Sequence, residues 1–407
     1  MLIADSWRRV CRRACFRVIC IIMSTLDYRT AGESHGPALT VLVESMPAGV
    51  PIELELINGE LARRQGGVGR GGRMKIERDS VELLSGVRGG LTIGSPIVMK
   101  IINRDCRLEE ACEIHRPRPG HADLAGSLKW LTTDCRETLE RASARETASR
   151  VAAGALARCL LRMFNIEVAG YVVRMLDVTG RVSRDMEMDE LRRLRDANSA
   201  YCPDADAAKR MIKAVEQAGS EGDTVGGVIE VQVRGQPPGI GSSMRWQDKL
   251  DGRLMWAVGS VQAFKGVEIG LGFTSASRRG SVVHDEIDYD PALHDTSGLG
   301  FVRLSNNAGG IEGGMTNGEP IVLRAAMKPI STLAKGLDSV DLLTKEPERC
   351  DYERSDVSAV PAASVVAENV VGFEIARAFL EKFGGDTLGE VRASHEHYLK
   401  TARSLGG

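Results

Sequence analysis

Residues 143–163, SARETASRVAAGALARCLLRM, carry the clearest secondary-structure signal in the chain. Apolar residues recur from Ala148 through Leu156 to Met163 with a period of 3.6, which predicts an amphipathic helix. Ser143 is a suitable N-cap, because Glu146 follows three residues later as in a capping box. We therefore expect a helix that begins near Ser143 and packs against the core.

Short apolar runs rich in β-branched residues lie on both sides of this helix and predict strands. The expected strands span residues 38–43, 81–84, 97–102, 166–173, 226–233 and 321–327. Residues 52–57 suit a strand or a helix start, and their continuation to Gly66 favours a helix with a glycine stop. Further helical patterns cover 181–220, 250–264 and 362–383, the last of them long and amphipathic.

Strands and helices interleave along the chain, and no fixed-period repeat or linker divides it. We therefore expect one α+β domain over residues 23–407. Residues 1–22 form an N-terminal extension in which five arginines precede the apolar run 18–22. This resembles a secretory signal, but the run is short and no small-residue cleavage site follows. We expect the extension to be disordered or to result from a misassigned start codon, with Met23 as the true start.

The overall composition excludes several classes of protein. A net charge of −2 argues against a nucleic acid or an acidic membrane as partner. No apolar run approaches the roughly 20 residues that span a bilayer. Nine cysteines, an odd number without a Cys-x-x-Cys pair, do not indicate a disulfide framework or a zinc site. We expect reduced thiols, no metal and a cytoplasmic location.

Two short loops place a histidine directly after or between glycines: Gly32-Glu33-Ser34-His35-Gly36 and Arg118-Pro119-Gly120-His121-Ala122-Asp123. Glycine lets the backbone approach a ligand closely, and imidazole exchanges protons near neutral pH. Either histidine alone is as well explained by a structural hydrogen bond. The pair, each with arginines nearby, suits general acid catalysis on a leaving phosphate or a developing anion.

Arginines are concentrated on glycine-rich segments and at the predicted helix start. They are Arg63, Arg64, Arg70, Arg73, Arg116, Arg118, Arg141 and Arg145. Guanidinium groups match carboxylate and phosphate oxygens, and a helix N-terminus favours the same anions. Any one of them is best explained as a solvated surface residue, but the set indicates a site for a polyanion. Asp356, beside Arg354, is a weaker candidate for a positioned base, and Lys328–Thr332 for a phosphate or flavin contact.

Several motifs in fixed order resemble those of the chorismate synthase family. They are residues 32–36, GRGGRM at 69–74, RPGHAD at 118–123, ERASARET at 140–147, AFKG at 263–266, and the segments 306–318, 327–332 and 353–356. The resemblance implies an α+β fold, a β-α-β sandwich with a helical core between antiparallel sheets, and a homotetramer. It also implies a shikimate-pathway lyase that converts 5-enolpyruvylshikimate 3-phosphate to chorismate and phosphate by trans-1,4-elimination, using reduced FMN.

The resemblance further implies roles for individual residues. His35 would protonate the leaving phosphate, His121 would act as an acid toward the flavin, and Asp356 would be the base that works through the flavin N5. The implied substrate contacts are Ser34, Arg64, Arg70, Arg73, Arg118, Arg145 and Arg354. The implied FMN contacts are Arg141, Ala142, Ser143, Gln262, Ala263, Gly313, Lys328, Pro329, Ile330, Ser331, Thr332 and Arg354.

Two other functions stay open from the sequence. Some members of the family also reduce flavin with NADPH, and Arg64 and Arg70 would then also contact NADP phosphates. A non-catalytic anion-binding protein would use the same arginines. Loss of activity without loss of ligand affinity in a His35→Ala variant separates the enzyme from the binding protein.

Overall fold

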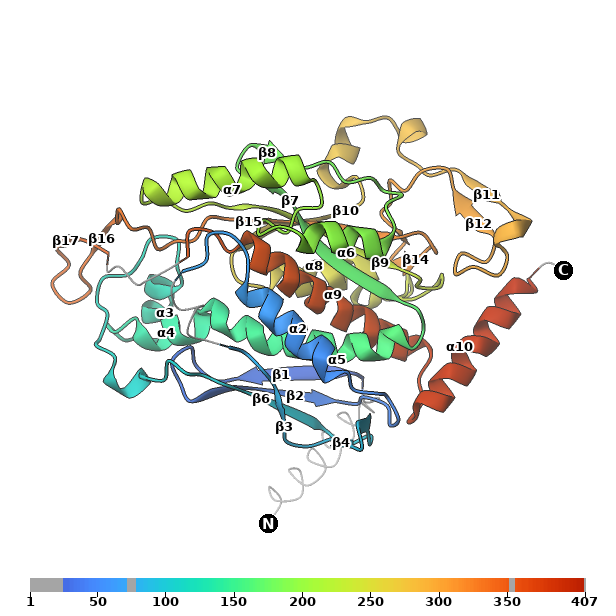
Figure 1. Ribbon diagram of the computed structural model, residues 1–407, viewed down its shortest axis with the longest axis horizontal. Coiled ribbons are helices and arrows are strands. Elements are labelled where there is room, and N and C mark those ends of the chain that lie inside the picture. Colours follow the sequence, from blue (N-terminus) through green and yellow to red (C-terminus); the bar gives the residue numbers. More distant parts are fainter. Residues whose placement is uncertain (1–24, 72–77, 351–355, 406–407) are drawn as a thin grey trace, which may run out of the picture.

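The computed structural model describes residues 25–71, 78–350 and 356–405. Three layers make up this part of the chain: a four-stranded sheet, a layer of helices and a five-stranded sheet (Figure 1). All strand pairs within the two large sheets are antiparallel. The expected α+β sandwich with a helical core between antiparallel sheets is therefore confirmed.

The four-stranded sheet has the order β1-β2-β6-β3. Its strands are β1 (Asp27–Ala31), β2 (Ala38–Glu44), β6 (Ile97–Ile102) and β3 (Glu82–Leu83). Alternate residues of β2 and β6 are buried, as expected for a sheet with one face on the core. The hairpin of β1 and β2 carries the first histidine loop at its turn, so the sheet fixes both ends of that loop.

The five-stranded sheet has the order β10-β15-β9-β7-β8. Its strands are β10 (Phe264–Ile269), β15 (Ile321–Met327), β9 (Gly227–Arg234), β7 (Glu167–Met175) and β8 (Val178–Thr179). β15 ends at Met327, so the segment Lys328–Thr332 begins where this strand leaves the sheet.

The helical layer consists of α2 (Leu54–Gln65), α5 (Thr147–Arg162) and α9 (Val360–Lys382). α5 packs against α9 and β2, and α9 packs against β7 and β9. Gly154 permits the close approach of α5 and α9, because a Cβ there would lie 2.1 Å from the carbonyl oxygen of Asn369. α5 and α9 are buried on nearly every side, so the expectation of amphipathic helices is wrong here. Sheets cover both faces of the layer and leave these helices no solvent side.

Shorter elements surround the sandwich. The helices are α3 (Asp123–Trp130), α4 (Arg136–Ala142), α6 (Met188–Asp196), α7 (Ala205–Ser220), α8 (Leu250–Gly259) and α10 (Leu388–Arg403). The 3₁₀ turns are η2 (Leu108–Glu110), η3 (Ala144–Glu146), η4 (Trp246–Asp248), η5 (Gly272–Ser277), η6 (Gly280–Val282) and η7 (Pro291–Leu293). The short strands are β4 (Val87–Arg88), β5 (Leu91–Thr92), β11 (Ile287–Tyr289), β12 (Phe301–Arg303), β13 (Ile311–Glu312), β14 (Met315–Thr316), β16 (Asp338–Val340) and β17 (Pro347–Arg349).

Two local expectations need correction. The helix expected over 250–264 ends at Gly259, and Phe264 already belongs to β10, because Ala263 turns the chain with a φ of 68°. Ser143 caps the short turn η3 by accepting from the backbone N–H of Arg145, not through a capping box with Glu146. Within residues 25–71, 78–350 and 356–405, no helix is both long and apolar enough to cross a bilayer.

Candidate functional site

The candidate site lies at the end of the helical layer where α2 ends and α5 and α9 begin (Figure 1). α3 and α4 pack on each other beside this end. A helix N-terminus carries partial positive charge and free N–H groups. Two such termini, those of α5 and α9, therefore favour an anion at this place before any side chain is considered.

His35 is held by Glu140 of α4. The imidazole Nδ1 lies 2.9 Å from Glu140 Oε1, and the backbone N–H of His35 donates to Glu140 Oε2 at 2.8 Å. The Nε2 atom lies 3.9 Å from a carboxylate oxygen of Asp105. Burial raises the pKa of Glu140, but its hydrogen bonds with His35 outweigh burial, and the net pKa is lowered. Glu140 is therefore a carboxylate that orients the ring through Nδ1.

His121 stands in a similar arrangement at the start of α3. Its Nδ1 is hydrogen-bonded to Asp123, which is fully buried. Arg118 donates to the same carboxylate through Nε at 2.8 Å, and it reaches Thr332 Oγ1 at 3.1 Å and the His121 ring at 3.0 Å. Burial alone would raise the pKa of Asp123. The hydrogen bonds with His121 and Arg118 outweigh burial, so the pKa lies well below its usual range. One carboxylate thus positions both a histidine and an arginine.

Arg64 and Arg145 form a buried cationic pair around one carboxylate, Asp79. Arg145 Nη1 donates to both oxygens of Asp79 at 2.7 Å, and Arg64 Nη1 lies 3.4 Å from one of them. Burial lowers the pKa of Arg64 to about 10; Asp79 opposes this shift, whereas Arg145 and Arg70 add to it. Two buried guanidinium groups thus meet at one carboxylate. Guanidinium groups are well suited to bind carboxylate and phosphate oxygens.

Asp356 is brought to the glycine loop that follows α2. Its carboxylate accepts from Arg70 Nη1 and, at 2.6 Å, from the backbone N–H of Gly71. The backbone N–H of Val357 donates to Gly69 at 2.7 Å, which fixes the segment just before α9. The carboxylate predicted as a base is therefore held on two sides, one of them an arginine that was predicted to contact substrate.

The predicted flavin contacts fall into two adjoining groups. Arg141 donates to the carbonyls of Gly32 and Thr30, and Ser143 Oγ donates to Ser34 Oγ at 3.1 Å, so this group joins the His35 loop. In the other group, the backbone N–H of Lys328 donates to Ala263 at 3.0 Å. A Cβ on Gly120 would lie 3.9 Å from Lys328 Nζ, so this group faces the His121 loop.

These groups close into one circuit of contacts. Glu146 accepts from Thr30 at 2.7 Å and from Gln262 at 3.2 Å, which joins the His35 group to Ala263 and Lys328. Thr224 donates to Ile330 at 2.7 Å, and the next residue, Val225, donates to Val357 at 2.8 Å. Arg64 donates to Thr147 and to the Ala144 carbonyl, both at 2.9 Å, which returns the circuit to Ser143. Residues far apart in sequence therefore surround one region.

Some predicted residues are not brought into this circuit. Arg73 and Arg354 lie outside the described residues. Gly313 lies in the turn between β13 and β14 with a φ of 60°. Among the described residues, no hydrogen bond or ion pair joins Gly313 to the other predicted contacts, so its role stays a prediction. Ala142 ends α4 between Arg141 and Ser143.

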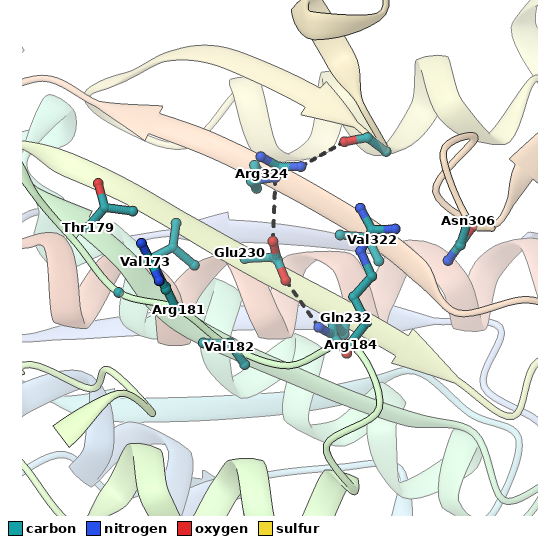
Figure 2. Close-up of a pocket in the computed structure, with 12 residues that line it drawn as sticks. Val173, Thr179, Arg181, Val182, Arg184, Glu230, Gln232, Asn306, Val322 and Arg324 are labelled. Carbon is teal, nitrogen blue, oxygen red and sulfur yellow. Dashed lines mark hydrogen bonds and ion pairs between the residues drawn. The ribbon is translucent and has the colours of Figure 1, made fainter. Parts of the chain in front are cut away.

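A separate cavity of about 340 Å³ opens on the outer face of the five-stranded sheet. Figure 2 shows Arg324 and Gln232 both directed at Glu230, with Arg181 and Arg184 from the segment after β8 at its side. None of the predicted site residues lines it. The candidate site is therefore defined by its circuit of contacts and not by this cavity.

The sequence reasoning assigned no role to four acidic or amide side chains of the site. Asp123 belongs to the motif RPGHAD, and Glu140 belongs to the motif ERASARET. Their positions close to a histidine and an arginine could therefore have indicated a role. Asp79 and Asn103 belong to no recognised motif. Only the fold shows that they reach Arg145.

Comparison with known proteins identifies the family of the chain. The profile of the family described as Chorismate synthase matches residues 26–380. The chorismate synthase of Geobacter sulfurreducens is 54% identical over 393 residues, which cover 93% of this chain and 100% of that protein. The chorismate synthase of Desulforamulus reducens is 52% identical over 392 residues with the same coverage.

A solved structure described as a crystal structure of chorismate synthase superposes with a TM-score of 0.76 at 39% identity. It covers 94% of this chain, and 99% of the solved chain is matched. Sequence and fold thus agree over nearly the whole length. The chain belongs to the chorismate synthase family, whose members are shikimate-pathway lyases acting on a phosphate-bearing substrate.

Proposed function

We propose that the chain converts 5-enolpyruvylshikimate 3-phosphate to chorismate and inorganic phosphate by trans-1,4-elimination in the presence of reduced FMN. The C–O bond to phosphate breaks, a ring proton leaves, and a new C=C bond forms, so the reaction is redox-neutral. The observation that supports this most is that two buried guanidinium groups, those of Arg64 and Arg145, meet at the one carboxylate of Asp79, next to the loop that carries His35. A substrate with a phosphate and two carboxylates suits such a concentration of cations.

The first histidine acts at the phosphate. With Nδ1 held by Glu140, the ring is oriented so that Nε2 is the atom left to protonate or stabilise the leaving group. Ser34 and Arg145 would bind the anionic groups of the substrate. Glu140 fixes the direction of the imidazole through Nδ1.

The second histidine and Asp356 handle the remaining protons. His121, hydrogen-bonded to Asp123 and beside the guanidinium of Arg118, would act at the edge of the site where negative charge develops. Asp356 is held in place by Arg70 and the Gly71 N–H, and it would accept a proton. Its hydrogen bonds fix the direction of the remaining lone pairs.

Membership of this family implies a flavin, and the described residues fit reduced FMN. Gln262 Oε1 is buried with no hydrogen-bond partner among them, as expected of a group that awaits a ligand donor. Burial, with Lys265 nearby, lowers the pKa of Lys328. Lys328, Ser331 and Thr332 would hold the FMN phosphate, and Arg141 to Ser143 would contact the remainder. When bound, reduced FMN supplies electron density transiently to the substrate.

An anaerobic assay tests the proposal. Protein, reduced FMN and 5-enolpyruvylshikimate 3-phosphate are mixed, and phosphate release and chorismate absorbance are followed. We expect product only with reduced flavin, and a loss of about a hundredfold or more in His35→Ala, His121→Ala and Asp356→Ala. Phosphate release without chorismate, or equal rates with oxidised flavin, contradicts the proposal. Turnover in air with NADPH and oxidised FMN alone would reveal an added flavin reductase activity.

A further inference from the structure

Asn103 ties the His35 loop to the buried arginine pair. It follows the last residue of β6, and its side chain is 4% exposed. Its amide nitrogen donates to the carbonyl of Gly36 at 2.7 Å and to that of Glu33 at 3.1 Å. These two carbonyls flank Ser34 and His35, so one amide group closes the loop around both residues.

The other end of the same amide faces Arg145. Asn103 Oδ1 accepts from Arg145 Nε at 2.8 Å, while Nη1 of that arginine is bonded to Asp79. The backbone N–H of Asn103 also donates to Pro37 at 3.2 Å. Only an amide can donate to two carbonyls and accept from a guanidinium in this geometry. A carboxylate accepts only, and an aliphatic side chain does neither.

We propose that Asn103 is a positioning residue, which sets the loop that carries His35 against the guanidinium of Arg145. The inference rests on the proposed function, from which the catalytic role of the His35 loop comes. The contacts of Asn103 do not depend on that function. Without Asn103 the loop keeps its bonds to Glu140 but loses its link to Arg145, and it would place the imidazole less accurately relative to the anion. An error of about 1 Å at such a group costs on the order of a hundredfold in rate.

Asn103→Asp is the sharpest test, because it keeps the size of the side chain and the acceptor for Arg145 but removes both donors. Asn198→Asp is the matched control. Asn198 also donates to two carbonyls, those of Leu194 at 3.1 Å and Cys202 at 2.8 Å, and it lies between α6 and α7, with no hydrogen bond to the His35 loop among the described residues. Both variants lose the same kind of bonds, so a general loss of stability affects both.

Two measurements are made on the full-length protein. The first is kcat and KM in the anaerobic assay. We expect Asn103→Asp to lower kcat by roughly tenfold to a hundredfold with KM within about threefold, and Asn198→Asp to change neither. The second needs no activity: the rate at which diethyl pyrocarbonate modifies His35, followed by mass spectrometry of its peptide. The His35 side chain is 22% exposed, so its reactivity reports how the loop holds it.

We expect faster modification of His35 in Asn103→Asp than in the wild type and in Asn198→Asp. Equal rates of His35 modification in all three proteins overturn the inference. A kcat of Asn103→Asp equal to that of an active wild type overturns it as well. If the wild type makes no chorismate, the proposed function fails, while the modification rates still decide whether Asn103 holds the loop. If Asn103→Asp does not fold, Asn103→Ser, which keeps one donor, replaces it in both measurements with the same expectations.

Discussion

Each imidazole of the site is paired with a carboxylate that is itself buried. Glu140 is 2% exposed and Asp123 is fully buried, and both have a lowered pKa. In both pairs the contact is made through Nδ1. The carboxylates therefore fix the direction of the rings.

Glu140→Gln should lower kcat by roughly tenfold or more with little change in protein stability. The variant removes the negative charge beside the His35 ring and replaces one of the two acceptor oxygens by an NH2 group, which cannot accept a hydrogen bond. Anaerobic kinetics across pH measure the effect. Glu230→Gln, on the outer face of the five-stranded sheet, is the control. An unchanged rate and profile in Glu140→Gln would show that Glu140 only supports the fold.

Residue by residue, the sequence predicted what lies in glycine-flanked motifs and missed what lies outside them. His35, His121 and Arg118 stand in loops whose composition points to a ligand. Asn103 ends an ordinary apolar strand, and Asp79 lies among charged residues in a surface-like pattern. Their contacts depend on how sheet and helices pack, and no local pattern encodes that.

Among the helices, a buried ionic cluster joins four of them. Glu368 of α9 accepts from Arg63 of α2, pairs with Arg158 of α5 at 2.9 Å, and accepts from Arg195 of α6 at 3.1 Å. Burial raises the pKa of Glu368, but the three guanidinium groups outweigh burial and lower it to about 2. The cluster fixes the relative positions of the helices whose ends form the site.

Glu368→Gln should destabilise the protein by about 3–5 kcal/mol at pH 7, because it leaves buried arginines without their carboxylate. A carboxyl with a depressed pKa contributes stability above its unfolded pKa and loses it as the pH falls toward its folded pKa. The difference between variant and wild type should therefore shrink between about pH 4.5 and pH 2. Urea unfolding at a series of pH values measures it, with the exposed Glu190→Gln as control. A difference that does not depend on pH contradicts the assignment.

The type and position of the long elements were predictable, but their surroundings were not. The strands at 97–102 and 321–327 are confirmed as β6 and β15, because β-branched runs between turn residues are a local signal. The helix expected over 362–383 was predicted to be amphipathic, whereas α9 and α5 are both enclosed on nearly every side. Small residues, alanine and glycine, lie on all faces of these helices and allow other elements to enclose them completely. The period of the larger apolar residues does not show that the remaining faces are buried as well.

The arrangement of the whole molecule followed from the resemblance and not from the residue patterns. Composition and periodicity indicated an α+β chain, but nothing in them ordered the strands or stacked the layers. The exterior of the described part also carries large apolar side chains that the three layers do not use. Trp246 in η4 is 78% exposed and Trp256 in α8 is 69% exposed, and these two elements are in contact. Exposed tryptophans in adjoining elements are typical of protein interfaces.

We propose that this surface of η4 and α8 is buried when four copies assemble, as the resemblance implies. Light scattering after gel filtration should then give a mass near four times 44.0 kDa. Trp246→Glu combined with Trp256→Glu should reduce that mass, because a carboxylate in an apolar interface has no partner. Leu84→Glu, at a side chain 52% exposed in the region of β3, should leave it unchanged. A wild-type mass of one chain contradicts the tetramer, and a double variant that keeps the wild-type mass shows that copies meet through another surface.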